Sequence, residues 1–335
     1  MKRIGHLHEK LLDKTYIKQT VEKASKHKTK RKLVKKVLAN IDYYVDMIHT
    51  MISKNEIVLE KTHTKVIVER GKTRTITISP FYPNQILDYL VVEILKPIIK
   101  KSMYEYCIGN VDKRGIMFGK KIMERKIKTY KYFMKLDIRH FYQNVKPKLL
   151  LKQLETKIKD KQFISFVEQV IDKNELPIGC YYSQWLSNFY LCSFDHFIKE
   201  QTKIPFYIRY VDDMVFSGNN KKELKKTYYQ AKRRLEQLGL EFKYLPTIKS
   251  TTNFLGFVFA ENDTKLRHSI FYKLQKTTKK FQKHVCFSMI KRIISYFSWL
   301  KNMRRGYNYY SNNIKPIIKL GTIKKCISKG ELVYV

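Results

Sequence analysis

The chain has 335 residues, of which 44% are apolar, and its formal net charge is +39, from 68 Lys and Arg against 29 Asp and Glu. This length and apolar content are enough to bury a large core, and the charge excess is typical of proteins that bind a polyanion. No apolar stretch reaches the roughly 18 residues needed to span a bilayer, and the N-terminus lacks the apolar core of a signal peptide, so we predict a cytoplasmic protein with no membrane partner.

Apolar periodicity divides the chain into helical and extended segments. Helical spacing occurs at residues 8–55, 84–105, 147–172, 183–200 and 224–238, and the residues beyond 259 are also mostly helical in pattern. Strand patterns occur at residues 66–68, 75–78, 133–136, 206–211 and 214–216, with shorter ones between 242 and 259. The first two strands are separated by Arg70, Gly71 and Lys72, which predicts a hairpin with a basic tip.

The two ends of the chain are more basic than its middle. Residues 1–36 hold 13 Lys and Arg against 3 Asp and Glu, and residues 264–335 hold 17 against 1. A run of charge is usually a solvated face. Two basic ends on either side of an acidic hairpin, however, favour the walls of a nucleic-acid channel.

The acidic hairpin is formed by Tyr210-Val211-Asp212-Asp213, where an apolar run stops at two adjacent carboxylates and then resumes. Carboxylates held this close repel each other and raise each other's pKa unless a cation compensates. Mg²⁺ prefers oxygen ligands and suits such a pair, whereas the simpler alternative is an acidic turn that faces solvent.

Asp137 is a third carboxylate of interest, because it ends the strand predicted at residues 133–136. Taken alone, it could simply cap the turn that follows. Two-metal phosphoryl transfer, however, needs a carboxylate that reaches the same ions from a neighbouring strand. The two acidic motifs together therefore favour a metal-dependent phosphoryl-transfer site.

Four stretches resemble motifs A, B, C and E of reverse transcriptases, in order and in approximate spacing. They are Leu136-Asp137-Ile138-Arg139-His140-Phe141-Tyr142, Pro177-Ile178-Gly179-Cys180-Tyr181-Tyr182-Ser183-Gln184, Tyr210-Val211-Asp212-Asp213 and Phe254-Leu255-Gly256. Each motif alone is weak, but four in order are specific. The resemblance covers residues from about 60 to 260.

The resemblance implies an α+β right-hand polymerase fold. Its expected parts are a basic helical N-terminal region at 1–60, fingers at 61–130, a palm with an antiparallel sheet at 131–262 and a helical thumb at 263–335. It also implies an RNA-directed DNA polymerase, a nucleotidyltransferase that uses two Mg²⁺ ions, with Mn²⁺ as a possible substitute. Its partners would be template RNA, cDNA and dNTPs.

The resemblance also assigns roles to residues at matching positions. Asp137, Asp212 and Asp213 match the metal ligands, and the Ile138 carbonyl would complete a metal shell. Lys249 is the candidate for the motif D lysine that protonates the leaving pyrophosphate. Its spacing after Gly239 is unusual, so Lys243 could serve instead. The residues expected to contact primer and template are Tyr210, Phe254, Leu255 and Gly256.

A further set would bind the incoming nucleotide: Arg74, Arg114, Tyr142, Gly179 and Gln184. Arg74 resembles the finger arginine that clamps the triphosphate. Tyr142 matches the aromatic gate that rejects a 2′-hydroxyl, although it could also be a core aromatic beside Phe141. Gly179 would let the backbone approach the incoming base pair.

Motif B departs from the common Gln-Gly pattern, because Ile178 precedes Gly179. This form resembles the diversity-generating retroelement branch, in which error-prone cDNA synthesis supports mutagenic retrohoming, with a small basic helical accessory protein as partner. An apolar side chain in place of the amide removes hydrogen-bond readout, which fits low fidelity. The alternatives are a phage-defence (antiviral) reverse transcriptase that makes a repetitive or protein-primed DNA, and a catalytically idle RNA-binding protein, against which the three retained aspartates argue.

Overall fold

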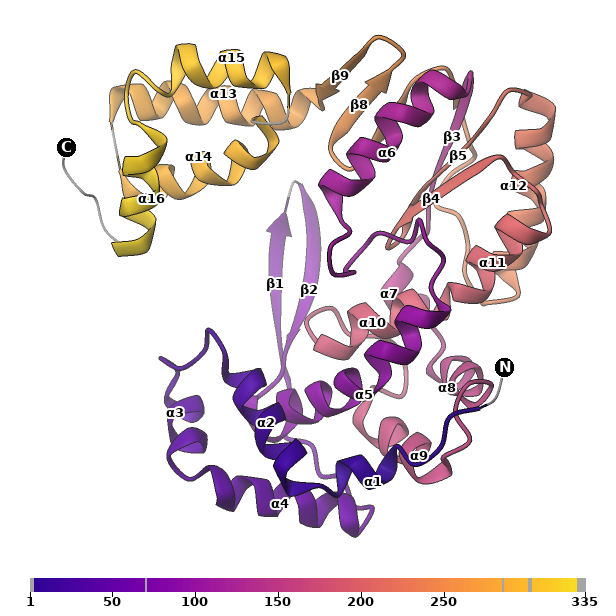
Figure 1. Cartoon of the computed structure of the whole chain (residues 1–335), viewed down its shortest axis with the longest axis vertical. Coiled ribbons are helices and arrows are strands. Elements are labelled where there is room, and N and C mark those ends of the chain that lie inside the picture. The colour runs from indigo at the N-terminus through magenta and orange to yellow at the C-terminus, as the bar shows by residue number, and fades with distance from the viewer. Residues whose placement is uncertain (1–2, 70, 285, 301–302, 330–335) are drawn as a thin grey trace.

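The computed structural model describes residues 3–69, 71–284, 286–300 and 303–329 (Figure 1). The N-terminal helices lie at one end of the molecule and the last four helices at the other end, with a two-stranded hairpin projecting between them. A four-stranded sheet and the helices around it form the remaining side.

Four helices open the chain, in agreement with the helical pattern at residues 8–55. They are α1 (His8–Leu11), α2 (Lys14–Ser25), α3 (Lys32–Ala39) and α4 (Ile41–Ser53). Asp13 caps α2 by accepting a hydrogen bond from the Thr15 amide at 2.8 Å. The helix α2 packs on both α4 and α5 (Ile86–Ser102), and α5 is preceded by the short π-helix η1 (Phe81–Gln85).

The predicted hairpin is formed by β1 (His63–Glu69) and β2 (Lys72–Ile78), which pair antiparallel from His63 opposite Ile78 to their tip. Arg70, in the predicted basic tip, lies outside the described residues. At the other end of the hairpin, the Thr77 amide donates to the Ile178 carbonyl at 2.7 Å. The hairpin is therefore joined directly to the segment that was identified as motif B.

The central sheet is antiparallel, in the order β4-β5-β3-β6. Its strands are β3 (Tyr132–Asp137), β4 (Phe206–Tyr210), β5 (Asp213–Gly218) and β6 (Ile248–Lys249). Side chains alternate between its two faces, as strand geometry requires. Met214 and Phe216 enter one core, shared with the N-terminal half of the chain, whereas Val215 enters a second core, shared with the C-terminal helices.

Seven more helices lie in the middle of the chain: α6 (Ile116–Thr129), α7 (Phe141–Asn144), α8 (Pro147–Glu155), α9 (Lys161–Val170), α10 (Tyr181–Tyr190), α11 (Cys192–Glu200) and α12 (Lys221–Glu236). Two predicted helices are each divided in two. The first division follows from Asp160, which caps α9 by accepting from the Phe163 amide at 3.0 Å, and the second falls at Leu191.

The helix α6 was not predicted. Its charged sequence and Gly119 obscure the apolar stripe, yet Gly119 has a packing reason. A Cβ at this position would lie 2.4 Å from side-chain atoms of Ile108 and Leu255. The glycine therefore allows α6 to pack closely against the side chains of Ile108 and Leu255.

The C-terminal part begins with a small sheet of β7 (Thr252–Phe254), β8 (Phe257–Ala260) and β9 (Asp263–Leu266), in that order. It continues with α13 (His268–Lys283), α14 (Phe287–Leu300), α15 (Arg304–Asn313) and α16 (Leu320–Lys329). The ring of Trp299 lies 5.1 Å from that of Phe257, so α14 is anchored on this sheet. Throughout the residues that the structure describes, no helix is both long enough and apolar enough to cross a membrane.

Candidate active site

The structure brings the three predicted aspartates to one end of the central sheet. Asp137, the last residue of β3, stands directly opposite Asp213, the first residue of β5. Tyr210 also pairs with Asp213, so Val211 and Asp212 form a two-residue turn. The Ile138 amide donates to the Asp212 carbonyl at 3.2 Å, which ties the end of β3 to this turn.

Asp213 has an unusual electrostatic environment. Its pKa is raised to about 7, mainly by burial; Lys135 opposes the shift, and Asp137 and Asp212 add to it. The Lys135 ammonium lies 2.9 Å from the Asp213 Oδ2. The other carboxylate oxygen, Oδ1, is buried and has no hydrogen-bond partner among the described residues.

These carboxylates fit a divalent cation chemically. Hard cations prefer carboxylate oxygens, and a buried oxygen that lacks a partner is available for such a ligand. Within the described ranges, however, no group of three or more His, Cys, Asp or Glu side chains is already arranged around a common metal position. Lys135 supplies the positive charge beside Asp213 in this structure.

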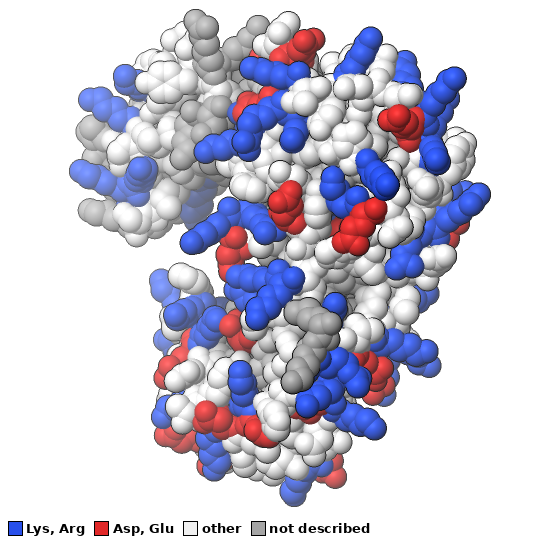
Figure 2. Space-filling view, turned by 45° about the vertical axis from the view of Figure 1, so that its right-hand side comes forward, with Lys and Arg blue, Asp and Glu red and all other residues white. Residues whose placement is uncertain are grey.

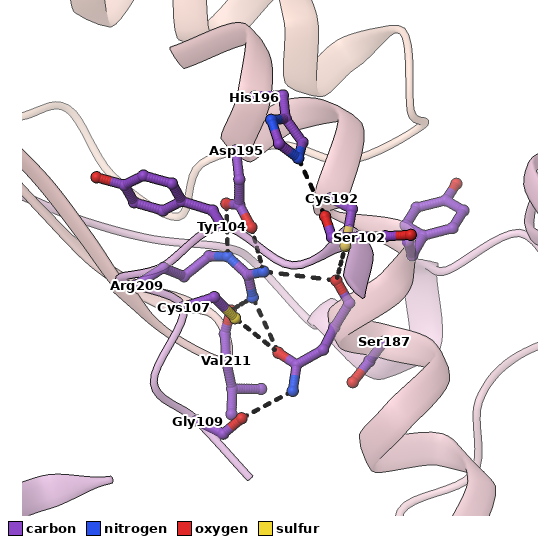
Figure 3. Close-up of polar contacts among 12 residues, drawn as sticks. Ser102, Tyr104, Cys107, Gly109, Ser187, Cys192, Asp195, His196, Arg209 and Val211 are labelled. Carbon is purple, nitrogen blue, oxygen red and sulfur yellow. Dashed lines mark hydrogen bonds and ion pairs between the residues drawn. The ribbon is translucent and has the colours of Figure 1, made fainter. Parts of the chain in front are cut away.

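The turn that carries Asp212 is strained. Val211 has φ 58°, in the left-handed region that a β-branched residue rarely adopts. Arg209 stabilises this conformation by donating from Nη1 to the Val211 carbonyl at 2.8 Å (Figure 3). Gly109 lies against the same turn, because a Cβ there would meet the Val211 Cγ2 at 2.7 Å, and its carbonyl accepts from the Asn188 amide group at 2.8 Å.

A buried ion pair positions Arg209. The side chains of Arg209 and Asp195 are both 0% exposed and are joined by two hydrogen bonds, Nε to Oδ1 at 2.8 Å and Nη2 to Oδ2 at 2.6 Å. The Tyr207 hydroxyl donates to the same Oδ1 at 2.8 Å, and Arg209 also donates to the Asn188 Oδ1 at 3.1 Å. This network was not predicted, although a single arginine inside the apolar run Phe206–Val211 was its signal.

Tyr142 lies beside the aspartates and is half-buried. Burial raises its pKa, a hydrogen bond with Ser187 opposes this shift, and the charge of Asp212 adds to it. Its ring is 5.6 Å from that of Phe141. The position is suitable for the predicted sugar gate, while Gln184, one turn before Ser187 on α10, is exposed.

The other predicted nucleotide ligands occupy different surroundings. Gly179 has φ +125°, and a Cβ there would lie 2.1 Å from the Thr77 carbonyl oxygen, so the close approach at this glycine is made by β2. Arg74 lies on the same strand and is exposed. Arg114 donates to the carbonyls of Tyr104 and Cys107 at 3.2 and 3.0 Å, which fastens the loop that leads to Gly109.

The two lysines considered for the proton-donor role lie at different distances from the aspartates. Lys249 pairs with Phe133, four residues before Asp137 on β3. At about 3.3 Å per residue, this separation is about 13 Å along the strand. Lys243 is closer in the backbone, because its amide donates to the Asp137 carbonyl at 2.8 Å.

Of the four residues predicted to contact primer and template, Tyr210 ends β4 beside the aspartates, and the other three lie at a tight turn between β7 and β8. Leu255 and Gly256 both have positive φ, 52° and 85°, between the paired residues Phe254 and Phe257. The side chains of Phe254 and Leu255 are buried. A Cβ on Gly256 would lie 2.7 Å from the Trp299 ring, so this turn packs directly against α14.

Comparison with known proteins agrees with this arrangement. The chain is 30% identical over 160 residues to the retron Ec83 reverse transcriptase of Escherichia coli, a match that covers 43% of this chain and 49% of the relative. The chain thus spans about half the length of the curated relative that it matches.

Telomerase from Candida albicans, solved in complex with a fragment of telomeric RNA, superimposes with a TM-score of 0.52 at 12% identity, covering 80% of this chain and 56% of that one. This likeness concerns the fold, and it agrees with the α+β right-hand polymerase fold that the motifs predicted. The family model for reverse transcriptase (RNA-dependent DNA polymerase) matches residues 52–259. The chain therefore belongs to the reverse transcriptase family.

Proposed function

We propose that this protein is an RNA-directed DNA polymerase that extends a primer on an RNA template. One observation carries the proposal. Asp137 and Asp213 face each other across two strands, Asp212 stands in the adjoining turn, and a buried carboxylate oxygen of Asp213 has no partner within the described residues. A reverse transcriptase site needs such oxygens to hold divalent ions.

The three aspartates, with the Ile138 carbonyl, would hold two Mg²⁺ ions, for which Mn²⁺ could substitute. When bound, such ions activate the primer 3′-hydroxyl and stabilise the leaving pyrophosphate. The protein's own side chains would orient the nucleotide. Tyr142 would lie under the sugar, and Arg74 on the projecting hairpin would bind the triphosphate.

We propose Lys243 as the proton donor to pyrophosphate. The Lys243 amide donates to the Asp137 carbonyl, whereas Lys249 lies on β6 opposite Phe133, four residues before Asp137 on β3. The test is a paired substitution of the two lysines.

The basic surface supports binding of template and product. Figure 2 shows the molecule hollowed between its upper and lower parts, with Lys and Arg side chains bordering the hollow. On the C-terminal helices, a cavity of about 420 Å³ is lined by basic side chains and by Tyr296. The basic residues are Lys273, Lys276, Lys280 and Arg292. Such side chains bind a phosphate backbone without regard to sequence.

For the biological role we propose error-prone copying in a diversity-generating retroelement, with a small basic helical accessory protein. The support is Ile178 in motif B, an apolar side chain where an amide is common. A second candidate is a retron or phage-defence enzyme, which the retron relative favours. Sequencing the RNA and cDNA that copurify with the protein separates them, because adenine-directed mutations are expected only in the first case.

The catalytic proposal is tested by Asp213→Asn, which keeps the shape of the side chain but removes its charge. We expect primer extension on RNA to fall at least about a thousandfold, in line with the loss of a metal ligand, while RNA affinity and thermal stability are retained. The matched control is Asp46→Asn on the exposed surface of α4, which should extend the primer normally. Normal extension by Asp213→Asn would contradict the proposed site.

A further inference from the structure

A second cavity lies on the far side of the ion-pair network from the catalytic turn. Its volume is about 580 Å³, within the range of small-molecule sites. It is lined by residues from α5, α8, α10, α11 and α12 and from the segments that follow α8 and α12. Helix α11 contributes to both the ion-pair network and the cavity. Its Asp195 accepts a hydrogen bond from Arg209, and the next residue, His196, lines the cavity and is hydrogen-bonded to the Ser102 carbonyl (Figure 3).

All the ionisable Lys, Arg, His, Asp and Glu side chains that line this cavity are basic. Lys101, Lys157, Arg234 and His196 all line it, and no Asp or Glu does. Glu200 accepts a hydrogen bond from His196 at 2.9 Å but is not part of the lining. A concave surface with cations only attracts anions, and its low-dielectric walls strengthen that attraction.

Three buried polar atoms of the lining have no hydrogen-bond partner among the described residues: Arg234 Nε, Ser193 Oγ and Gln153 Oε1. Buried polar atoms in folded proteins are rarely left unpaired, so each indicates a ligand or water. The Arg234 side chain is held in place, because its Nη1 donates to the Gln237 Oε1 at 2.9 Å. Its Nε is still available to donate to a ligand.

The chemistry of these atoms defines the ligand. Arg234 Nε and the Ser193 hydroxyl can donate to phosphate oxygens. Gln153 Oε1 can only accept, so the ligand must also carry a donor, such as a sugar hydroxyl or a base amino group. Leu149, Phe189 and Leu238 supply the apolar part of the lining. A phosphate, a hydrogen-bond donor and an apolar ring together describe a nucleotide.

We propose that this cavity binds a nucleotide through its phosphate, either as a free mononucleotide or as part of an RNA strand that lies outside the catalytic site. The inference does not depend on polymerase activity, because none of the residues placed at the metal, sugar or triphosphate positions lines the cavity. The cavity would be a second phosphate-binding site, separated from the aspartates by the buried ion pair of Arg209 and Asp195.

The test uses the full chain in EDTA, with AMP, adenosine and a ten-nucleotide oligoadenylate as probes and calorimetry as the measurement. The double variant Arg234→Gln, Lys157→Gln should bind AMP or the oligonucleotide at least about tenfold more weakly than wild type. The control double variant Arg233→Gln, Lys152→Gln removes the same charge from exposed positions on α12 and α8. It should bind as wild type does. Thermal melting should be equal for both variants.

The probes distinguish the source of the phosphate. If the site takes a free nucleotide, wild type should bind AMP and the cavity variant should bind AMP more weakly. If the site takes RNA, wild type should bind AMP poorly, and the cavity variant should bind the oligonucleotide more weakly. Adenosine should bind weakly in all cases, because it lacks phosphate. Equal binding by the two variants, or no saturation of wild type by either probe up to about 10 mM, would overturn the proposal. Since DNA synthesis is not measured, either result leaves the polymerase proposal to its own test.

Discussion

Substitution of Asp195 tests whether the buried network positions the turn that carries Asp212. Asp195→Asn keeps the size of the side chain but leaves the fully buried Arg209 guanidinium without a counter-charge. Breaking a buried pair by removing one partner typically costs about 3–5 kcal/mol in the free energy of unfolding, a large part of the roughly 5–15 kcal/mol that stabilises most proteins. Urea unfolding followed by circular dichroism measures this cost.

A second variant separates stability from positioning. Replacing both charges, in Asp195→Leu with Arg209→Met, removes the desolvation cost along with the ion pair, so unfolding should recover to within about 1–2 kcal/mol of wild type. The Val211 carbonyl nevertheless loses the donor that lies 2.8 Å away in the native protein. We therefore expect primer extension to remain at least about tenfold reduced in this stable variant, equivalent to about 1.4 kcal/mol.

The control is the exposed pair of Lys100 and Asp112, in which Asp112 is 58% exposed. Asp112→Asn should cost at most about 1 kcal/mol and leave primer extension unchanged. Full activity in the stable double variant would refute the positioning role of Arg209. A cost below about 1 kcal/mol for Asp195→Asn would refute the energetic reasoning about the buried pair.

Three further predictions concern single side chains. Tyr142→Val should raise the ratio of rNTP to dNTP incorporation at retained stability; a core role instead predicts an unchanged ratio and a loss of about 3–5 kcal/mol. Lys243→Met should slow single-turnover nucleotide addition by about 10²-fold or more, whereas Lys249→Met should be near wild type, and the reverse order would restore Lys249 as the proton donor. For Asp88, burial raises the pKa to about 7, against the Tyr181 amide that donates to it at 3.2 Å. Between about pH 4 and 7 the folded state therefore holds a proton that the unfolded state has lost. As the pH rises through this range, this group should lower the free energy of unfolding by about 1.4 kcal/mol per pH unit. Asp88→Asn should remove that part of the slope in urea titrations; an unchanged slope would contradict it.

Much of the fold was predictable because its signals are local. The apolar run that stops at Asp212 and Asp213 and then resumes predicted the hairpin, and the apolar residues before Asp137 predicted the strand β3. The convergence of the aspartates followed from these two patterns and from the resemblance to reverse transcriptases. Helix α6 was not predicted, because its basic residues and Gly119 interrupt the apolar stripe in the sequence. The reason for a glycine at this position is its close packing against Leu255, which only the structure shows.

The environment of the site was decided by tertiary structure alone. Arg209, Asp195 and Gly109 come from three separate segments, and no periodicity links them. A buried charge is tolerated only where its partner is supplied in space, and the sequence does not state which carboxylate that will be. Likewise the pKa of Asp213 depends on how deeply β5 is buried and on Lys135 across the sheet. The sequence by itself therefore determined which acidic side chains stand at the ends of neighbouring strands, and the three-dimensional packing determined how they are held and charged.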